Sequence, residues 1–331
     1  MNIFLSIFKL LPPEISHSIA LNSLNFLYKL KLFPLLISNI ENENENEDYE
    51  INGLIFKNKL GTAAGLDKNG DFIDCLGGLG FGFLEVGTVT PIPQIGNPKP
   101  RVFRLFQEKA VINRLGFNNK GIDHLVKNLK KKKFDGIVGV NIGANKDSKD
   151  QKRINDYLEC LRKVSTLSDY ITINISSPNT PGLRDLHSEE NIKKLINSIQ
   201  IEANKINFLG PIFIKISPDE SFELIKNIAE IVEESSLAGL IVSNTTISRS
   251  ALKNKKHQAI EGGLSGAPLM EKSTELLKKL HDRYPNLTLI GAGGVITKSD
   301  FNKKILSGAS LVQIYTGFII KGPKIVEDIL H

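Results

Sequence analysis

Short apolar runs alternate with amphipathic stretches through most of the chain. Eight of these runs have the length and the content of buried β-strands. They end at residues 60–61, 83–89, 137–142, 170–175, 212–216, 239–242, 287–290 and 311–315. Between most of them apolar residues recur with helical spacing, at residues 157–164, 192–201, 222–233 and 274–280. The pattern therefore predicts strands and helices in alternation.

Eight strands that alternate with helices over about 280 residues match the size of a (β/α)₈ barrel. A doubly wound open sheet is the competing fold, and it needs a glycine-rich dinucleotide turn after its first strand. Residues 61–65, Gly-Thr-Ala-Ala-Gly, only loosely resemble such a turn, and no acidic residue follows at a suitable strand end. We therefore predict an α/β fold of the TIM-barrel type.

The first forty residues have a different pattern. Residues 1–11 are mostly apolar and end at Pro12-Pro13, and residues 31–40 are apolar but broken by Pro34. Between them, Ile15, Ile19, Leu24, Leu27, Phe26 and Leu30 recur along a predicted helix at residues 14–30. No run approaches the roughly 20 apolar residues that cross a bilayer, and no signal-peptide cleavage site is present. Two alternatives stay open: a helical hairpin packed on the barrel, or an amphipathic hairpin lying in a membrane surface.

Residues 41–50 carry six acidic side chains in ten positions, which cannot form a core. We interpret this segment as a flexible linker. The predicted organisation is an N-terminal helical domain at residues 1–40, an acidic linker at 41–50 and a catalytic barrel at 51–331.

The composition is that of an ordinary globular protein, with 24% charged and 41% hydrophobic residues and a net charge of +6. The basic cluster at Lys127 and residues 130–133 is typical of a solvated helix end, so we expect no nucleic-acid partner. Cys75 and Cys160 have neither disulfide nor metal-ligand spacing, which favours a reducing compartment such as a bacterial cytoplasm.

Polar residues cluster after the predicted strands, where barrel enzymes carry their active sites. Asn141, Asn174, Lys215 and the run Ser243-Asn244-Thr245 all follow strands in this way. Glycine-rich turns at residues 291–294 and 315–317 follow the last two strands, a common place for a phosphate. We therefore predict a phosphorylated ligand at this face.

The loop at residues 174–184, Asn-Ile-Ser-Ser-Pro-Asn-Thr-Pro-Gly-Leu-Arg, is stiffened by two prolines and rich in donors. No His, Asp or Glu pair and no metal-ligand cluster lies at the strand ends, so we expect no metal site. Acid–base chemistry then depends on a hydroxyl of this loop, and the difficult electronic step on a cofactor.

Several motifs, in order between about residue 60 and residue 323, resemble those of the dihydroorotate dehydrogenase family. They are Ala-Ala-Gly-Leu-Asp-Lys, Gly-Thr-Val-Thr-Pro, Pro-Arg-Val-Phe-Arg-Leu, Asn-Arg-Leu-Gly-Phe-Asn-Asn, the 174–184 loop, Asn-Thr-Thr, Gly-Gly-Leu-Ser-Gly and Val-Gln-Ile-Tyr-Thr-Gly-Phe. The N-terminal extension and a serine at position 177, where the soluble class places cysteine, resemble the quinone-dependent, membrane-associated class 2. A catalytically inactive relative would be expected to lose Lys68, Ser177 or Lys215, and all three are present.

The resemblance implies oxidation of L-dihydroorotate to orotate in pyrimidine biosynthesis, with one bound FMN per chain. Ser177 would be the base for the C5 proton while the C6 hydrogen passes as hydride to flavin N5, and Thr180 and Phe117 would shape the proton exit. The implied substrate-binding residues are Lys68, Asn113, Arg114, Leu115, Gly116, Phe117, Asn174, Asn179, Asn244 and Thr245. The implied FMN-binding residues are Ala64, Gly65, Leu66, Asp67, Lys68, Thr88, Asn141, Asn174, Lys215, Ser243, Gly266, Gly294, Tyr315 and Thr316.

The resemblance also favours the membrane alternative for the N-terminal hairpin. It implies a tunnel, lined by His17, Arg104 and Tyr315, through which ubiquinone or menaquinone reaches the flavin. We accordingly expect a monomer bound peripherally to the cytoplasmic side of a bacterial inner membrane.

Overall fold

The computed structural model describes residues 11–33, 48–179 and 188–331. Eight parallel strands close into a barrel in which each strand pairs with its neighbours and the last pairs with the first. In order around the barrel they are β3 (Leu60–Thr62), β4 (Phe83–Val89), β7 (Ile137–Ile142), β8 (Tyr170–Asn174), β9 (Ile212–Ile216), β10 (Gly239–Val242), β12 (Thr288–Ala292) and β13 (Leu311–Ile314). The predicted TIM-barrel fold is confirmed.

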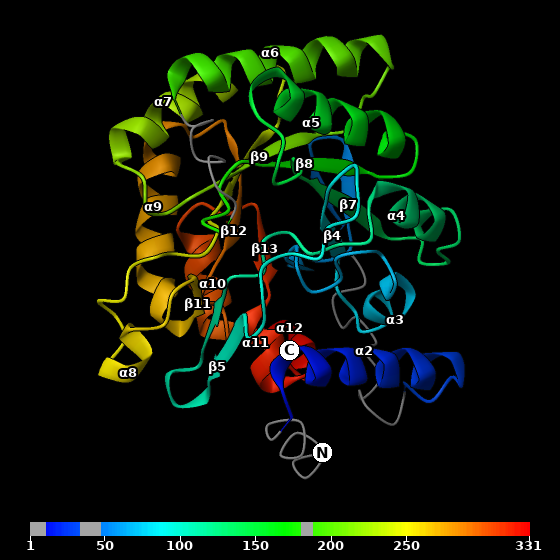
Figure 1. The fold of residues 1–331 in the computed structure, drawn as a ribbon, viewed down its shortest axis with the longest axis vertical. Helices are drawn as coiled ribbons and strands as arrows, with labels where there is room; N and C mark the ends of the chain where they lie inside the picture. Colours follow the sequence, from blue (N-terminus) through cyan, green and yellow to red (C-terminus); the bar gives the residue numbers. More distant parts are fainter. Residues whose placement is uncertain (1–10, 34–47, 180–187) are drawn as a thin grey trace.

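Helices lie outside this barrel (Figure 1). They are α3 (Ile73–Gly77), α4 (Ile122–Leu129), α5 (Asp150–Val164), α6 (Glu189–Lys205), α7 (Phe222–Glu233), α8 (Lys255–Gln258), α9 (Met270–Arg283), α10 (Lys298–Leu306), α11 (Thr316–Lys321) and α12 (Ile325–Leu330). Each of the four helices predicted between the strands is present, although α5, α6 and α9 extend beyond the predicted ranges.

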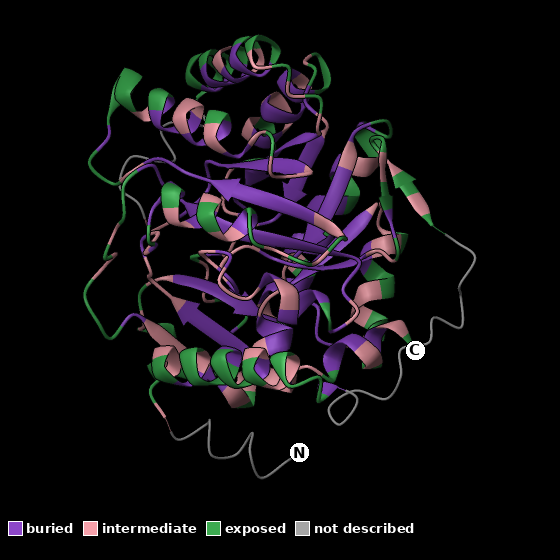
Figure 2. Ribbon diagram, turned by 90° about the vertical axis from the view of Figure 1, so that its right-hand side faces the viewer, coloured by how far each residue is buried: buried purple, intermediate pink, exposed green. Residues whose placement is uncertain are grey.

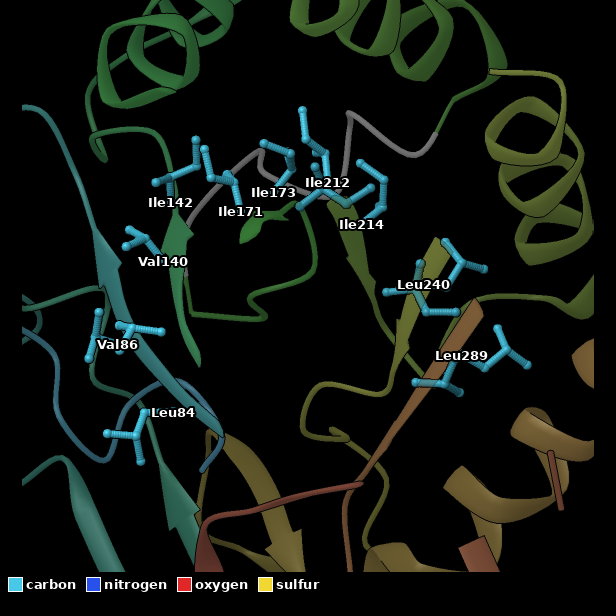
Figure 3. Close-up of a cluster of buried hydrophobic side chains, with 14 of the residues drawn as sticks. Leu84, Val86, Val140, Ile142, Ile171, Ile173, Ile212, Ile214, Leu240 and Leu289 are labelled. Atoms are coloured by element: carbon cyan, nitrogen blue, oxygen red, sulfur yellow. The ribbon is translucent and has the colours of Figure 1, made fainter. Parts of the chain in front are cut away.

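The main core lies between the strands and the helices. Alternate strand residues such as Leu84, Val86, Ile171 and Leu240 contribute to it and are completely buried or nearly so (Figure 3). Their neighbours in sequence point into the barrel instead, because successive side chains of a strand alternate between its two faces.

Aromatic rings fill the end of the barrel at which the strands begin. Phe83, Tyr170 and Phe213 meet edge to face, with ring centroids 6.3 and 5.7 Å apart. A hairpin of β1 (Tyr49–Ile51) and β2 (Leu54–Phe56) covers this end, where Phe56 packs on Phe83. Tyr49 and Glu50, assigned to the linker from the sequence, belong instead to β1. The rest of the predicted linker, through residue 47, lies outside the described residues.

Of the predicted N-terminal hairpin the structure describes one helix, α2 (Pro13–Lys29). Its buried residues are Ser16, Leu21 and Leu24, whereas Ile15 and Phe26 are 51% and 61% exposed. Ile19 and Leu30 are exposed as well, so the predicted apolar face does not pack on the barrel as one unit (Figure 2). Within the described residues, no helix has both the length and the apolar character needed to span a membrane.

A small antiparallel sheet of β5 (Val102–Leu105), β6 (Ala110–Asn113) and β11 (Gly263–Gly266) joins α2 to the barrel mouth. The buried Arg101 guanidinium donates to the Glu14 carboxylate of α2, with a shortest distance of 2.8 Å. On the same sheet, Arg104 donates to the Ser16 hydroxyl at 3.0 Å and to the carbonyl of Leu11. These contacts determine which face of α2 is turned toward the barrel.

Candidate active site

A cavity opens where the barrel strands end, between them and the β5–β6–β11 sheet. Residues at the ends of β3, β4, β8, β9, β10, β12 and β13 line it. The predicted site residues among them are Ala64, Gly65, Lys68, Thr88, Asn113, Leu115, Gly116, Phe117, Asn174, Ser177, Asn179, Lys215, Ser243, Asn244, Thr245, Gly266, Gly294, Tyr315 and Thr316. Side chains far apart in the sequence are thus brought to one place.

Four predicted binding residues do not line the cavity. Leu66 is buried in the hydrophobic core, and the Arg114 guanidinium turns away to the carbonyl of Pro100, at 3.0 Å, and the ring of Phe103. Asp67 accepts hydrogen bonds from the backbone N–H groups of residues 69, 71 and 72, so it shapes the loop that carries Lys68. Asn141 does not line the cavity itself but is hydrogen-bonded to Thr88 and Asn174, which do. Thr180 is outside the described residues.

Other lining residues were not predicted individually as site residues, although Ala292, Gly293 and Gly317 belong to the two glycine-rich turns predicted for a phosphate. They are Ala63, Asn118, Pro178, Ser265, Leu269, Ala292, Gly293, Val295, Gln313, Ile314 and Gly317. Ser265 shares a hydrogen bond of 2.7 Å with the Thr316 hydroxyl, and Gln313 reaches the cavity from inside the barrel. Their strand positions could have indicated Ser265 and Gln313, since both are polar residues in otherwise apolar strands.

Two lysines give the cavity its charge. The Lys215 side chain is almost completely buried, and the structure gives neither its ammonium nor that of Lys68 a hydrogen-bond partner among the described residues. Burial lowers the pKa of both lysines, and the carboxylates of Glu85 (for Lys215) and of Glu14 and Asp67 (for Lys68) oppose this shift. A cavity with two ammonium groups, that of the buried Lys215 and that of the partly buried Lys68, which lack hydrogen-bond partners among the described residues, suits an anionic ligand.

Ser177 follows β8 and is 6% exposed at the cavity wall. Its hydroxyl oxygen accepts a hydrogen bond from the backbone N–H of Asn179 at 3.3 Å, and the Asn179 amide donates to the carbonyl of Asn113 at 3.2 Å. The buried Tyr157 hydroxyl donates to the carbonyl of Asn174 at 2.8 Å, which anchors the start of the loop. Ser177 therefore sits on backbone that is tied to two other parts of the site.

Phe117 occupies the left-handed region with φ 52°, which is rare for an aromatic residue. Its carbonyl accepts from the amides of Asn119, at 2.7 Å, and Gln94, at 3.2 Å. These hydrogen bonds hold the strained backbone in place and present the Phe117 ring to the cavity.

Glycines in the cavity lining occupy positions where neighbouring atoms leave no room for a side chain. Gly266, Gly293 and Gly294 all have positive φ, at 95°, 96° and 90°. A Cβ on Gly294 would meet the Cα of Met270 at 2.3 Å, and one on Gly266 would meet the carbonyl of Lys109 at 2.2 Å. Exposed backbone N–H groups in such turns suit a phosphate.

The three predicted tunnel residues lie on the side where α2 meets the barrel. Burial lowers the pKa of His17 to about 4, with a further contribution from the charge of Lys68, so the imidazole is neutral at pH 7. Tyr315 lines the cavity, and burial together with the charge of Glu14 raises its pKa to about 12. Arg104 is held by α2 through Ser16 and Leu11. The cavity and α2 therefore adjoin through His17, Lys68 and Tyr315.

Comparison with known proteins gives consistent results. Residues 48–331 match a model of the family described as dihydroorotate dehydrogenase. The dihydroorotate dehydrogenase (quinone) of Saccharophagus degradans is 44% identical over 326 residues, which cover 96% of this chain and 94% of the relative. That of Vibrio atlanticus is 48% identical over 290 residues, or 86% of each chain.

The fold gives the same result. The structure of DHODH from Eimeria tenella in complex with ferulenol superimposes with a TM-score of 0.87 at 36% sequence identity. The match covers 96% of this chain and 89% of that one, so it includes α2 as well as the barrel.

The glycine turn provides a test of the cavity's geometry. Gly294→Ala should destabilise the protein by ~1 kcal/mol for the positive φ and by a further ~1–3 kcal/mol because the methyl group meets Met270. Gly53→Ala is the matched control, since Gly53 also has positive φ but no atom within 4 Å of its Cβ position. Thermal unfolding of both variants measures the difference, and equal losses would show that the turn has room for a side chain.

Proposed function

The chain belongs to the dihydroorotate dehydrogenase family, in its quinone-dependent class, and from this premise we propose that it oxidises L-dihydroorotate to orotate with bound FMN and passes the electrons to a membrane quinone. One observation carries the proposal: Lys68 and the buried Lys215, neither with a hydrogen-bond partner among the described residues, converge with a loop serine on one cavity that also has glycine turns suited to a phosphate. Orotate and FMN are both anions.

We assign two sets of residues to the two ligands. Lys68, Asn113, Asn179, Asn244 and Thr245 would hold the carboxylate and ring amides of the pyrimidine. Lys215, Thr88, Asn174 and Ser243 would hold the flavin ring, with Gly266, Gly294 and Thr316 at its phosphate. Gln313 lines the cavity, and its buried carbonyl oxygen has no hydrogen-bond partner among the described residues.

When bound, FMN supplies the acceptor for the hydride from C6 of the substrate. Ser177 would take the C5 proton, and Phe117 together with Thr180 would shape its exit. A serine hydroxyl is a poor base in open water, because it is too weakly acidic to lose its own proton at neutral pH. The reaction therefore needs a site that excludes water. Ser177 meets this requirement through its burial, and the cation of Lys68 would stabilise negative charge on the substrate.

The exposed apolar side chains of α2 would lie in the membrane surface. Ile15, Ile19, Phe26 and Leu30 are all exposed on or directly after this helix, and its barrel-facing side adjoins Lys68 and Tyr315. A quinone leaving the bilayer beside α2 would then pass His17 and reach the edge of the flavin. The protein would then bind peripherally to the cytoplasmic side of a bacterial inner membrane.

Replacing the proposed base separates chemistry from binding. Ser177→Ala should lower kcat by about 10²–10⁴-fold, the usual contribution of a positioned proton acceptor. FMN content and orotate affinity should stay near those of the wild type, because the variant removes only a hydroxyl. Stopped-flow reduction of the flavin by dihydroorotate measures the step directly, and near-normal reduction would contradict the assignment.

Polar substitutions on α2 test the membrane surface. The double variant Ile19→Gln/Phe26→Gln should bind phosphatidylethanolamine–phosphatidylglycerol vesicles roughly tenfold or more weakly, since two inserted apolar side chains are lost. The matched control is Ile201→Gln/Leu209→Gln, which removes side chains that are 69% and 96% exposed elsewhere. Flotation with the vesicles measures binding, and equal loss in both variants would contradict a specific role for α2.

A further inference from the structure

A buried carboxylate lies beneath the site and has no part in the proposed chemistry. Glu85 on β4 points into the barrel, is completely inaccessible to solvent and does not line the cavity. Its Oε1 accepts from the Asn141 amide at 2.9 Å. Its Oε2 accepts from Thr172 at 2.9 Å, Tyr170 at 3.1 Å and the Gln313 amide at 2.8 Å. Four donors thus converge on one carboxylate, which acts only as an acceptor.

This carboxylate determines which way the amide of Asn141 faces. Asn141 must turn its NH₂ group toward Glu85, so its carbonyl oxygen faces the opposite side. There it accepts from the Thr88 hydroxyl at 2.6 Å and from the Asn174 amide at 3.2 Å. Because the side-chain oxygen of Asn141 can only accept, Asn174 must turn its NH₂ group toward it.

The same reasoning extends from Asn174 to the cavity wall. Because the NH₂ group of Asn174 points to Asn141, its carbonyl oxygen accepts from the backbone N–H of Ser176 at 3.2 Å and from the Asn244 amide at 3.5 Å. The Asn244 amide also donates to the Ser176 hydroxyl at 3.0 Å. A directed series of hydrogen bonds thus runs from Glu85 through Asn141 and Asn174 to Asn244.

We propose that Glu85 is a positioning residue that fixes, through Asn141 and Asn174, which amide groups the site presents as donors and which as acceptors to flavin and pyrimidine. The inference rests on the proposed function. Glu85 has the same effect on Gln313: its amide NH₂ is held by Glu85, so its carbonyl oxygen, which has no partner among the described residues, faces away from the carboxylate. The negative charge of Glu85 also favours a protonated Lys215.

The variant Glu85→Gln keeps the shape of the side chain but replaces one acceptor oxygen by an NH₂ donor at the start of the hydrogen-bond series. The three donors at Oε2 favour the carbonyl oxygen of the new amide, so its NH₂ group would face Asn141. Asn141 would then have to turn over, and Asn174 with it. We expect orotate and FMN to bind roughly 10- to 100-fold more weakly, because mispaired buried amides carry a penalty of that size. Flavin absorbance changes report orotate binding, and the rise in flavin fluorescence when the holoenzyme is diluted reports release of FMN.

A second substitution should restore the direction. In the double variant Glu85→Gln/Asn141→Asp, the carboxylate introduced at position 141 accepts from the new amide and, through its other oxygen, from Thr88 and Asn174 as in the wild type. Most of the lost orotate affinity should return. The matched control is Tyr170→Phe, which removes a hydrogen bond to the same carboxylate but leaves Asn141 unaffected. It should lower thermal stability and leave orotate affinity unchanged.

Each outcome decides the proposal. Loss in Glu85→Gln, recovery in the double variant and retention in Tyr170→Phe support it. Unchanged affinity in Glu85→Gln, loss without recovery, or an equal loss in Tyr170→Phe overturns it. If both Glu85 variants fail to fold while Tyr170→Phe folds, Glu85 serves the barrel and the positioning role falls. A wild type that binds neither FMN nor orotate would instead refute the proposed function.

Discussion

The hydrogen bonds that converge on Glu85 tie four strands of the barrel together. The carboxylate comes from β4, and its partners come from β7, β8 and β13. A buried carboxylate is costly unless its oxygens are fully satisfied, and here four donors satisfy it. The interior of the barrel is therefore aromatic at the end covered by β1 and β2, polar around Glu85 and open at the cavity. The polar layer around Glu85 thus lies between the aromatic layer and the cavity.

Charge distinguishes this cavity from an ordinary barrel mouth. Lys215 is buried and Lys68 is partly buried, and neither has a hydrogen-bond partner in the described parts of the chain, whereas Glu14 is paired with Arg101 at the rim. Hydrogen bonds and charge from Arg101, together with Lys99 and Lys68, outweigh burial and lower the pKa of Glu14. The ion pair therefore holds α2 against the barrel without cancelling the positive charge inside. An anion entering the cavity finds two cations ready to bind it.

The sequence predicted the barrel and most of the cavity lining, because strand periodicity locates the strand ends and the polar residues that follow them. It did not lead to Glu85 or Gln313, because the prediction rested on polar residues at and after the strand ends, whereas these two lie within the predicted strands. Arg114, predicted to bind the substrate, does not line the cavity, because its guanidinium turns to Pro100. The periodicity of apolar residues also did not predict which face of α2 is exposed. Polar contacts of Glu14 and Ser16 with the β5–β6–β11 sheet set its rotation.

The most direct test of this account is to follow the flavin of the purified protein under anaerobic conditions. L-Dihydroorotate should bleach the flavin absorbance, with one orotate formed per flavin reduced. Subsequent addition of a short-chain quinone should restore the absorbance. Reduction without reoxidation by quinone would contradict the role given to α2 and its adjoining residues. A flavin that dihydroorotate does not reduce would contradict the account as a whole.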